Sequence, residues 1–324
     1  MSRLLDVSDL KVTFGTRYGT VTALDSVSFH VDQGETLGIV GESGCGKSIT
    51  ALSLMGLIPT PPGKIAAGSI KFLGNELIGL PPTQLRSLRG SDMAMIFQEP
   101  MTSLNPVFTV GEQIAEAITL HQNLDHEKAF KQAIELLDRV GIPSPEKRAR
   151  DFPHQLSGGM RQRVMIAMAV SCRPKILIAD EPTTALDVTV QAQIFDLLNE
   201  VQREFGAAII LITHDMGAIS EMADRVAVMY AGRIIEEGRA DDILDHPQHP
   251  YTRGLISCIP SLDQTQDRLR EIPGIVPPLH ELGAGCAFAK RCDHAFDRCL
   301  TARPSLSTAG HHPNACFAVE EQRL

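Results

Sequence analysis

The stretch Gly41-Glu-Ser-Gly-Cys-Gly-Lys-Ser48 matches the pattern G-x-x-x-x-G-K-[ST] of phosphate-binding loops. The apolar residues 36–40 before it predict a short buried strand, and residues 49–57 after it predict a helix. Glycines allow such a loop to close round a phosphate with its backbone N–H groups pointing inward, and the helix N-terminus adds partial positive charge there. Strand, loop and helix in this order therefore predict a nucleotide phosphate site.

Two side chains at the end of this loop have specific expected roles. Lys47 would reach the β- and γ-phosphates, and Ser48 would ligate Mg²⁺. Cys45 fills a variable position of the pattern, so we assign its thiol no chemistry. The residues expected to bind the nucleotide here are Gly41, Glu42, Ser43, Gly44, Cys45, Gly46, Lys47, Ser48 and Ile49.

The bulk properties of the chain exclude several classes of protein. It has 324 residues and a formal net charge of −9, which argues against a nucleic-acid-binding surface. No apolar run approaches the 18 or so residues of a membrane span, and the N-terminus lacks the apolar core of a secretory signal. We therefore expect a cytosolic chain without nucleic-acid partners, in which structural disulfides do not form.

Apolar periodicity predicts short strands that alternate with helices, a pattern typical of a largely parallel sheet. The predicted strands are 4–14, 27–31, 36–40, 69–72, 94–97, 176–179 and 207–212, and the helices are 49–57, 110–120, 126–140, 157–170 and 188–205. Helical spacing over about 101–170 indicates a helical insertion. Pro, His and Cys become frequent after 245, so we predict one domain at 1–245 and an extension at 246–324.

Three further segments carry chemistry. An apolar strand ends at Asp180-Glu181, where the aspartate could support Mg²⁺ and the glutamate could polarise the attacking water. Leu156-Ser-Gly-Gly-Met160 opens a helix with a serine N-cap and exposed N–H groups, which is a second anion site. His214 follows a buried strand and could contact a γ-phosphate, although a histidine at a strand end is more often a turn residue.

Together these segments resemble the ATP-binding-cassette (ABC) ATPases over about residues 4–245, and Leu-Ser-Gly-Gly is the signature of that family. The resemblance implies a phosphate-loop NTPase core with a mostly parallel sheet, an antiparallel β subdomain, an inserted helical subdomain and a Cys-rich C-terminal extension. It implies ATP and Mg²⁺ as cofactors, because the ATPases of this family use both.

Each site residue takes a role from the resemblance. Gln98 would hold Mg²⁺ and the lytic water, and Asp180 would support Mg²⁺. Glu181 would be the general base, and His214 would sense the γ-phosphate. Ser157 and Gly159 would act on ATP held by a second ATPase subunit, and Gly158 between them is also expected to bind nucleotide. Asp187 would lie at the dimer interface.

The family also stacks an aromatic side chain on adenine. Both Tyr18 and Phe14 qualify, and counting back from the strand that contains Phe29 favours Tyr18. Phe14 could equally be a residue of the strand core.

Residues 96–106 resemble the glutamine-loop region of peptide and nickel importers, and residues 249–255 resemble a segment that follows the cassette in the same group. The resemblance implies an ATPase that energises import of dipeptides or oligopeptides. The same engine could import nickel, glutathione or another small solute, and a soluble cassette ATPase without a transport role is a further alternative. The implied partners are a second ATPase chain, two transmembrane permease subunits and an extracytoplasmic solute-binding protein, and the implied location is the cytoplasmic face of the inner membrane.

Four of the seven cysteines crowd into the tail, at Cys286, Cys292, Cys299 and Cys316. Their spacing lacks the close pair of typical zinc sites and the C-x2-C run of ferredoxins. The residues alone leave open a metal site, free thiols or buried small residues, and either zinc or an iron–sulfur cluster if a metal is bound. The resemblance to the dipeptide ATPases implies a structural [4Fe–4S] cluster. Cys172 and Cys258 are expected to be small core residues.

Overall fold

The computed structural model describes residues 3–17, 19–99, 103–184, 186–258, 271–307 and 312–324. Their contacts divide the chain into two compact units. We call residues 32–35 and 79–212 the helical unit, and residues 3–31, 36–78 and 213–324 the phosphate-loop unit. The predicted domain boundary near 245 therefore does not coincide with this division, and it stays a prediction.

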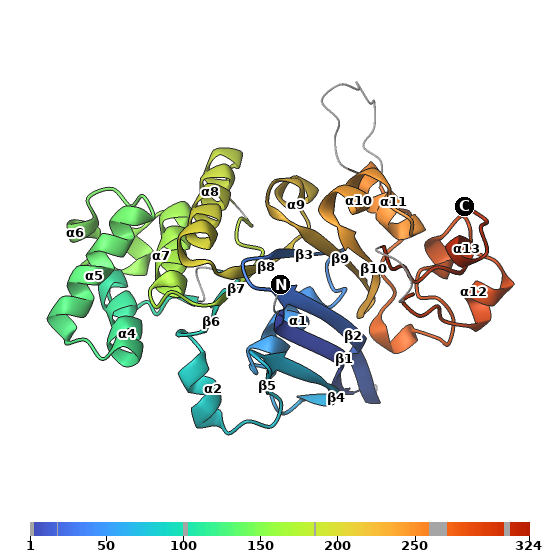
Figure 1. Cartoon of the computed structure of the whole chain (residues 1–324), viewed down its shortest axis with the longest axis horizontal. Helices are drawn as coiled ribbons and strands as arrows, with labels where there is room; N and C mark the ends of the chain where they lie inside the picture. The colour runs from blue at the N-terminus through green and yellow to red at the C-terminus, as the bar shows by residue number, and fades with distance from the viewer. Residues whose placement is uncertain (1–2, 18, 100–102, 185, 259–270, 308–311) are drawn as a thin grey trace. The chain divides into compact units, whose positions relative to one another are not determined.

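One antiparallel sheet of the phosphate-loop unit has the strand order β2-β1-β4-β5 (Figure 1). Its strands are β1 (Arg3–Thr16), β2 (Gly19–Asp32), β4 (Gly63–Phe72) and β5 (Asn75–Glu76). In the β1–β4 pair Leu5 lies opposite Phe72 and Phe14 opposite Gly63. β4 starts at Gly63, whereas the sequence predicted a strand only from 69. The first residues of β4 carry little hydrophobic pattern, and they are extended because they pair with β1.

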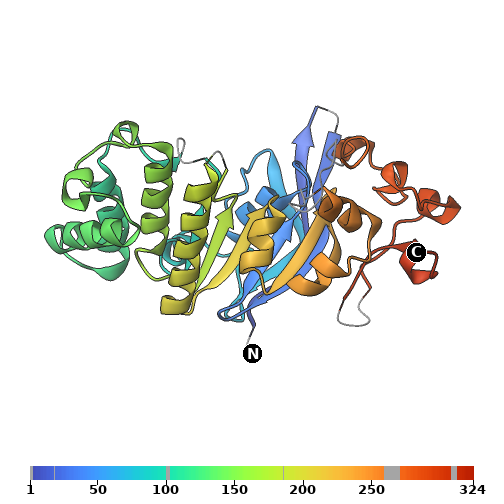
Figure 2. The same ribbon diagram turned by 90° about the horizontal axis from the view of Figure 1, so that it is seen from above.

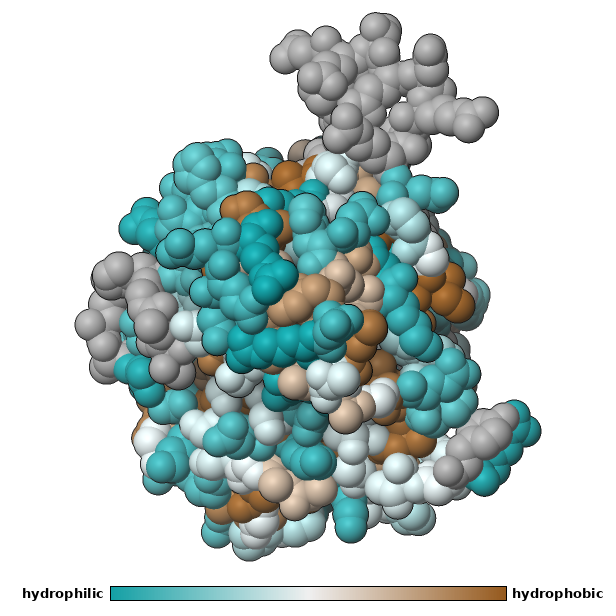
Figure 3. Space-filling model, turned by 90° about the vertical axis from the view of Figure 1, so that its right-hand side faces the viewer, coloured by the Kyte–Doolittle hydropathy of each residue, from teal (hydrophilic) through white to brown (hydrophobic). Residues whose placement is uncertain are grey.

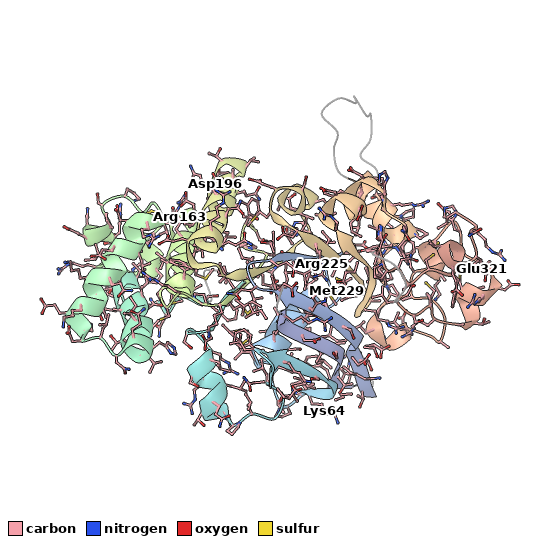
Figure 4. The ribbon with its side chains drawn as sticks, in the orientation of Figure 1. Lys64, Arg163, Asp196, Arg225, Met229 and Glu321 are labelled. Atoms are coloured by element: carbon pink, nitrogen blue, oxygen red, sulfur yellow. The ribbon has the colours of Figure 1, made fainter. Side chains whose placement is uncertain are left out.

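A second set of strands in this unit lies next to the phosphate loop. Strand β3 (Thr36–Val40) pairs in parallel with β9 (Arg225–Tyr230), and β10 (Arg233–Arg239) pairs antiparallel with β9. Figure 4 labels Arg225 and Met229 on β9. β9 and β10 were not among the strands predicted from the sequence.

The helical unit contains three parallel strands in the order β8-β7-β6. They are β6 (Met93–Ile96), β7 (Ile176–Asp180) and β8 (Ala208–Thr213), close to the predicted ranges. α4 packs against α5 and α7, and the green helices form one group in both ribbon views (Figure 2). The helices are α2 (Pro82–Leu88), α4 (Val110–Gln122), α5 (His126–Arg139), α6 (Pro145–Arg148), α7 (Gly158–Val170) and α8 (Val188–Phe205), with a 3₁₀ turn at Pro153–Gln155.

These helices form where capping and amphipathic pattern agree. Asp125 accepts the Lys128 N–H at the start of α5 at 3.0 Å, and the buried face of α5 carries Ala129, Ala133 and Leu137. The predicted insertion thus consists largely of helices within the described residues, and its first residues, 101 and 102, lie outside them.

The remaining helices belong to the phosphate-loop unit. They are α1 (Lys47–Leu54), α9 (Met216–Met222), α10 (Ala240–Asp245), α11 (Pro250–Ser257), α12 (Asp297–Thr301) and α13 (Phe317–Glu320), with 3₁₀ turns at Leu279–Glu281 and Ala289–Arg291. Figure 3 shows a face covered mainly by hydrophilic residues with scattered hydrophobic ones. Within the part of the chain that the structure describes, no helix combines the length and apolarity needed to cross a membrane.

Candidate nucleotide site

The phosphate loop links β3 to α1, as the sequence predicts, and its glycines are needed for steric reasons. Gly41 has φ of +152° and Gly46 has φ of +113°. A Cβ at Gly41 would overlap the carbonyl oxygen of Met229, and one at Gly46 would lie 2.8 Å from Leu24 Cδ2. Only glycine therefore allows the loop to pass this close to β9 and β2.

Lys47 lies within this loop, at the first position of α1. Its ammonium donates hydrogen bonds to the carbonyl oxygens of Gly41 at 2.8 Å and Glu42 at 3.2 Å, and the residue is only 5% exposed. A buried ammonium at the N-terminus of a helix makes the loop strongly attractive to a polyphosphate. Burial raises the pKa of the neighbouring Cys45 thiol, so this cysteine stays protonated at neutral pH.

A second group of expected site residues follows the ends of β6 and β7 in the helical unit. Gln98 Nε2 donates to Glu181 Oε2 at 2.9 Å, and Thr184 Oγ1 donates to the same oxygen at 2.9 Å. Glu181 has φ of +47°, a conformation that non-glycine residues rarely adopt and that is common at functional sites. The structure thus brings Gln98 and Glu181 together.

Asp180 is the last residue of β7 and is 3% exposed. Gln98, Asp180 and Glu181 lie in the helical unit, whereas the phosphate loop and His214 lie in the other unit. His214 is exposed and lies between β8 and α9. That the two groups act on one nucleotide stays a prediction.

The signature segment forms a helix start, as predicted. Ser157 caps α7 by accepting the N–H of Met160 at 3.3 Å. Ser157 and Gly158 are exposed, and a Cβ at Gly158 would meet nothing within 4 Å. Asp187 caps α8 by accepting the Val190 N–H at 3.0 Å and is exposed as well.

The adenine-stacking prediction falls partly outside the structure. Tyr18 lies outside the described residues. Phe14 packs in the β1–β4 ladder, where its ring is so close to Gly63 that a Cβ there would lie 2.6 Å from Phe14 Cε1. This contact agrees with the alternative that Phe14 packs within its strand rather than on adenine.

Two residues that contact the phosphate loop were not predicted. The hydroxyl of Tyr251 accepts the Glu42 N–H at 2.8 Å, and Arg291 forms a bidentate ion pair with the Glu42 carboxylate. Tyr251 belongs to the segment 249–255 that the sequence singled out, but no local pattern marks Arg291. Its contact joins residues 249 positions apart.

The cysteine-rich tail differs from expectation. All four cysteines line one small cavity of about 20 Å³. However, among the described residues no group of three or more potential ligands is placed so that it could hold a metal ion, so the expected metal site is not formed in this structure. Burial raises the pKa of Cys286 to about 11 and also raises the pKa values of Cys292 and Cys316. Four thiols are suitable ligands for zinc or an iron–sulfur cluster, but they are not placed here so that they could hold one.

Cys172 and Cys258 were expected to be core residues. Both are only partly buried, whereas Cys45 is fully buried. The sequence around these two cysteines does not distinguish a buried position from a partly exposed one near a helix end.

The fold and these motifs define the class of protein, a phosphate-loop ATPase of the cassette type. The chain belongs to the ABC transporter family. The ABC transporter family model matches residues 24–184, and a second model, the oligopeptide/dipeptide transporter C-terminal region, matches residues 235–299.

Curated relatives are similar to the chain over nearly its whole length. The oligopeptide transport ATP-binding protein AppD of Bacillus subtilis (strain 168) is 50% identical over 99% of this chain and 98% of its own. The oligopeptide transport ATP-binding protein OppD of Escherichia coli (strain K12) is 52% identical over 99% of this chain and 95% of its own.

A solved structure shares the cassette fold. The ATP-binding cassette MJ0796, a dimer in a post-hydrolysis state bound to ADP and Pi, superposes with a TM-score of 0.66. It is 26% identical and covers 73% of this chain and 98% of its own.

Proposed function

We propose that this chain hydrolyses ATP to energise the import of dipeptides or oligopeptides through a membrane ABC transporter. The similarity to oligopeptide transport ATP-binding proteins over 99% of the chain carries the proposal. The match of residues 235–299 to the oligopeptide/dipeptide transporter C-terminal region supports a peptide cargo over nickel, glutathione or another solute.

In this proposal the phosphate loop binds the triphosphate. Lys47 neutralises the charge of the β- and γ-phosphates. Ser48, Gln98 and Asp180 would hold Mg²⁺, and the ion would supply further positive charge there. Glu181 accepts a proton from the attacking water, which Gln98 orients. Support comes from the 2.9 Å hydrogen bond between Gln98 and Glu181. His214 contacts the γ-phosphate.

A second cassette completes the site. The exposed turn at Ser157, Gly158 and Gly159 contacts ATP held by the partner ATPase, and Asp187 lies at the same interface. The dimeric state of the solved cassette relative supports this arrangement. One chain alone then lacks half of each site, so hydrolysis requires dimerisation.

The remaining partners are two transmembrane permease subunits and an extracytoplasmic solute-binding protein. The chain would associate peripherally with the cytoplasmic face of the inner membrane through the permease. Residues 1–245 would form the ATPase domain, and 246–324 would form the extension. Membrane fractions from cells with and without the permease genes test the location, because the chain should sediment with membranes only when the permease is present.

We also propose that the four tail cysteines bind a [4Fe–4S] cluster with a structural role. The position of all four cysteines round one cavity supports it. Iron and sulfide analysis of anaerobically purified protein tests it, with Cys292→Ser as the variant that should lose both. Stoichiometric zinc or metal-free protein would contradict it.

Uptake of labelled dipeptides, longer peptides and nickel by cells tests the function. We compare a deletion strain complemented with the wild type, with Glu181→Gln, or with Glu200→Gln, a matched change at an exposed residue of α8. Peptide uptake should fail in the deletion strain and with Glu181→Gln, and should return with Glu200→Gln. Loss of nickel uptake with intact peptide uptake would show that the proposed peptide cargo is wrong.

A further inference from the structure

The second residue of the phosphate loop is held from the C-terminal extension. Arg291 donates two hydrogen bonds to the Glu42 carboxylate, from one terminal nitrogen to Oε2 at 2.7 Å and from the other to Oε1 at 2.9 Å. The Arg291 side chain is 5% exposed and that of Glu42 is 29% exposed. A bidentate pair in this environment is stronger and more directional than a surface ion pair.

The backbone of Glu42 is held as well. Its N–H donates to the hydroxyl of Tyr251, which is 0% exposed. The Tyr251 ring packs against Tyr230, with ring centroids 4.6 Å apart, and against Phe288 at 5.4 Å. This aromatic group fixes the hydroxyl, and the hydroxyl fixes the direction of the Glu42 peptide group.

Arg291 is itself rigidly placed. Its guanidinium donates to the carbonyl oxygens of Pro273 at 2.8 Å and Ile272 at 3.2 Å, and to the Tyr230 hydroxyl at 3.3 Å. It also lies over the Phe288 ring, 5.8 Å from its centroid. A guanidinium is always protonated at physiological pH, so this cation is permanent.

The position of this pair has an electrostatic consequence. Glu42 places a carboxylate in a loop that has to receive a polyphosphate, and an unneutralised anion there would repel the ligand. Arg291 neutralises that charge and holds the carboxylate in place. The Glu42 N–H donates to Tyr251 and therefore does not point at the ligand. This hydrogen bond fixes the path of the chain at the start of the loop, ahead of the residues whose N–H groups would contact the phosphates.

We infer that Arg291 and Tyr251 are positioning residues of the phosphate loop, through which the C-terminal extension sets the affinity for ATP. The inference rests on the proposed role of the phosphate loop as the ATP site. It gives the extension a function within the ATPase reaction, and it predicts an effect on nucleotide binding rather than on the hydrolytic step.

The test uses the full-length chain and titration with a fluorescent ATP analogue, together with KM for ATP and kcat in the assembled transporter. Arg291→Lys keeps the charge but loses the bidentate geometry, and Tyr251→Phe removes only the hydroxyl. Each should weaken ATP binding about tenfold with kcat changed less than about twofold, because binding geometry is disturbed and the hydrolytic groups are not. Lys290→Ala, at the exposed neighbouring position, is the matched control and should bind as the wild type.

A double-mutant cycle tests whether Arg291 acts through Glu42. Arg291→Gln should weaken binding much less in a Glu42→Gln background than in the wild type, because the carboxylate to be neutralised is gone. Equal effects in both backgrounds would overturn the inference, as would Arg291→Lys and Tyr251→Phe proteins that bind ATP within about twofold of wild type.

One further variant separates this inference from the proposed function. Lys47→Ala should abolish binding of the analogue if the phosphate loop is the ATP site. If Lys47→Ala binds normally, the ATP-site assignment is wrong. If Lys47→Ala loses binding while Arg291→Lys and Tyr251→Phe, with unchanged melting temperatures, do not, only the positioning role is wrong.

Discussion

His249 should make the phosphate-loop unit sensitive to mild acid. This residue is 3% exposed and caps α11, where its Nδ1 accepts the N–H of Tyr251 at 3.0 Å. Burial lowers the pKa of His249 from its ordinary value of 6.5 to about 3. A protonated ring could not accept that hydrogen bond, and its charge would be buried.

The size of the effect follows from proton linkage. Between about pH 3 and 6.5 the unfolded chain binds a proton at His249 that the folded chain does not. The contribution of neutral His249 to the free energy of unfolding is therefore fully present above about pH 6.5. It is lost progressively as the pH falls towards the pKa of His249 in the folded state. At about pH 5 the free energy of unfolding should be about 2 kcal/mol lower than at about pH 7.5 on account of this one group.

Urea unfolding at about pH 5 and pH 7.5 measures this difference in the free energy of unfolding. The chain has no tryptophan and three tyrosines, and two of these, Tyr230 and Tyr251, pack against each other in this unit, so tyrosine fluorescence reports on it. In His249→Asn the amide oxygen can cap α11 but does not titrate, so about 2 kcal/mol of the pH dependence should vanish. All groups other than residue 249 are the same in both proteins, so the comparison isolates the contribution of His249. Identical pH dependence in both would refute the reasoning.

Four substitutions in the candidate site give further predictions. Gly41→Ala should weaken ATP binding by about tenfold or more because its Cβ would overlap the Met229 carbonyl, whereas Gly44→Ala, which meets no atom within 4 Å, should weaken it less; titration with a fluorescent ATP analogue compares them. Gly158→Ala should leave the melting temperature unchanged or raise it, since alanine is favoured in helices, yet should lower ATPase activity if this turn contacts the partner's nucleotide. Glu181→Gln should slow single-turnover hydrolysis by about 10²–10⁴-fold with ATP affinity kept, and hydrolysis at the wild-type rate would exclude Glu181 as the base.

Much of the fold and the local elements of the candidate site could be predicted from short stretches of sequence. The phosphate loop, the capped start of α7 at Ser157 and the strand ending at Asp180 each have a pattern within a few residues, because turn geometry, capping and strand burial are local requirements. The structure confirms these elements close to their expected bounds.

The parts that the sequence did not reveal depend on contacts between distant residues. β9 and β10 were not predicted, because a short apolar run indicates a strand only once a partner such as β3 is known. Whether four cysteines at irregular spacing approach closely enough for a metal depends likewise on the path of the tail, and the structure places them round one cavity without forming the metal site.

By itself the sequence determined the class of the protein, because a phosphate has to be met by glycines, a lysine and a helix start in one short stretch of chain. Only the tertiary structure showed that Arg291 and Tyr251 hold Glu42 of that loop. An ion pair or a buried hydroxyl has no sequence pattern of its own. It exists only where folding brings two distant segments together and removes them from water.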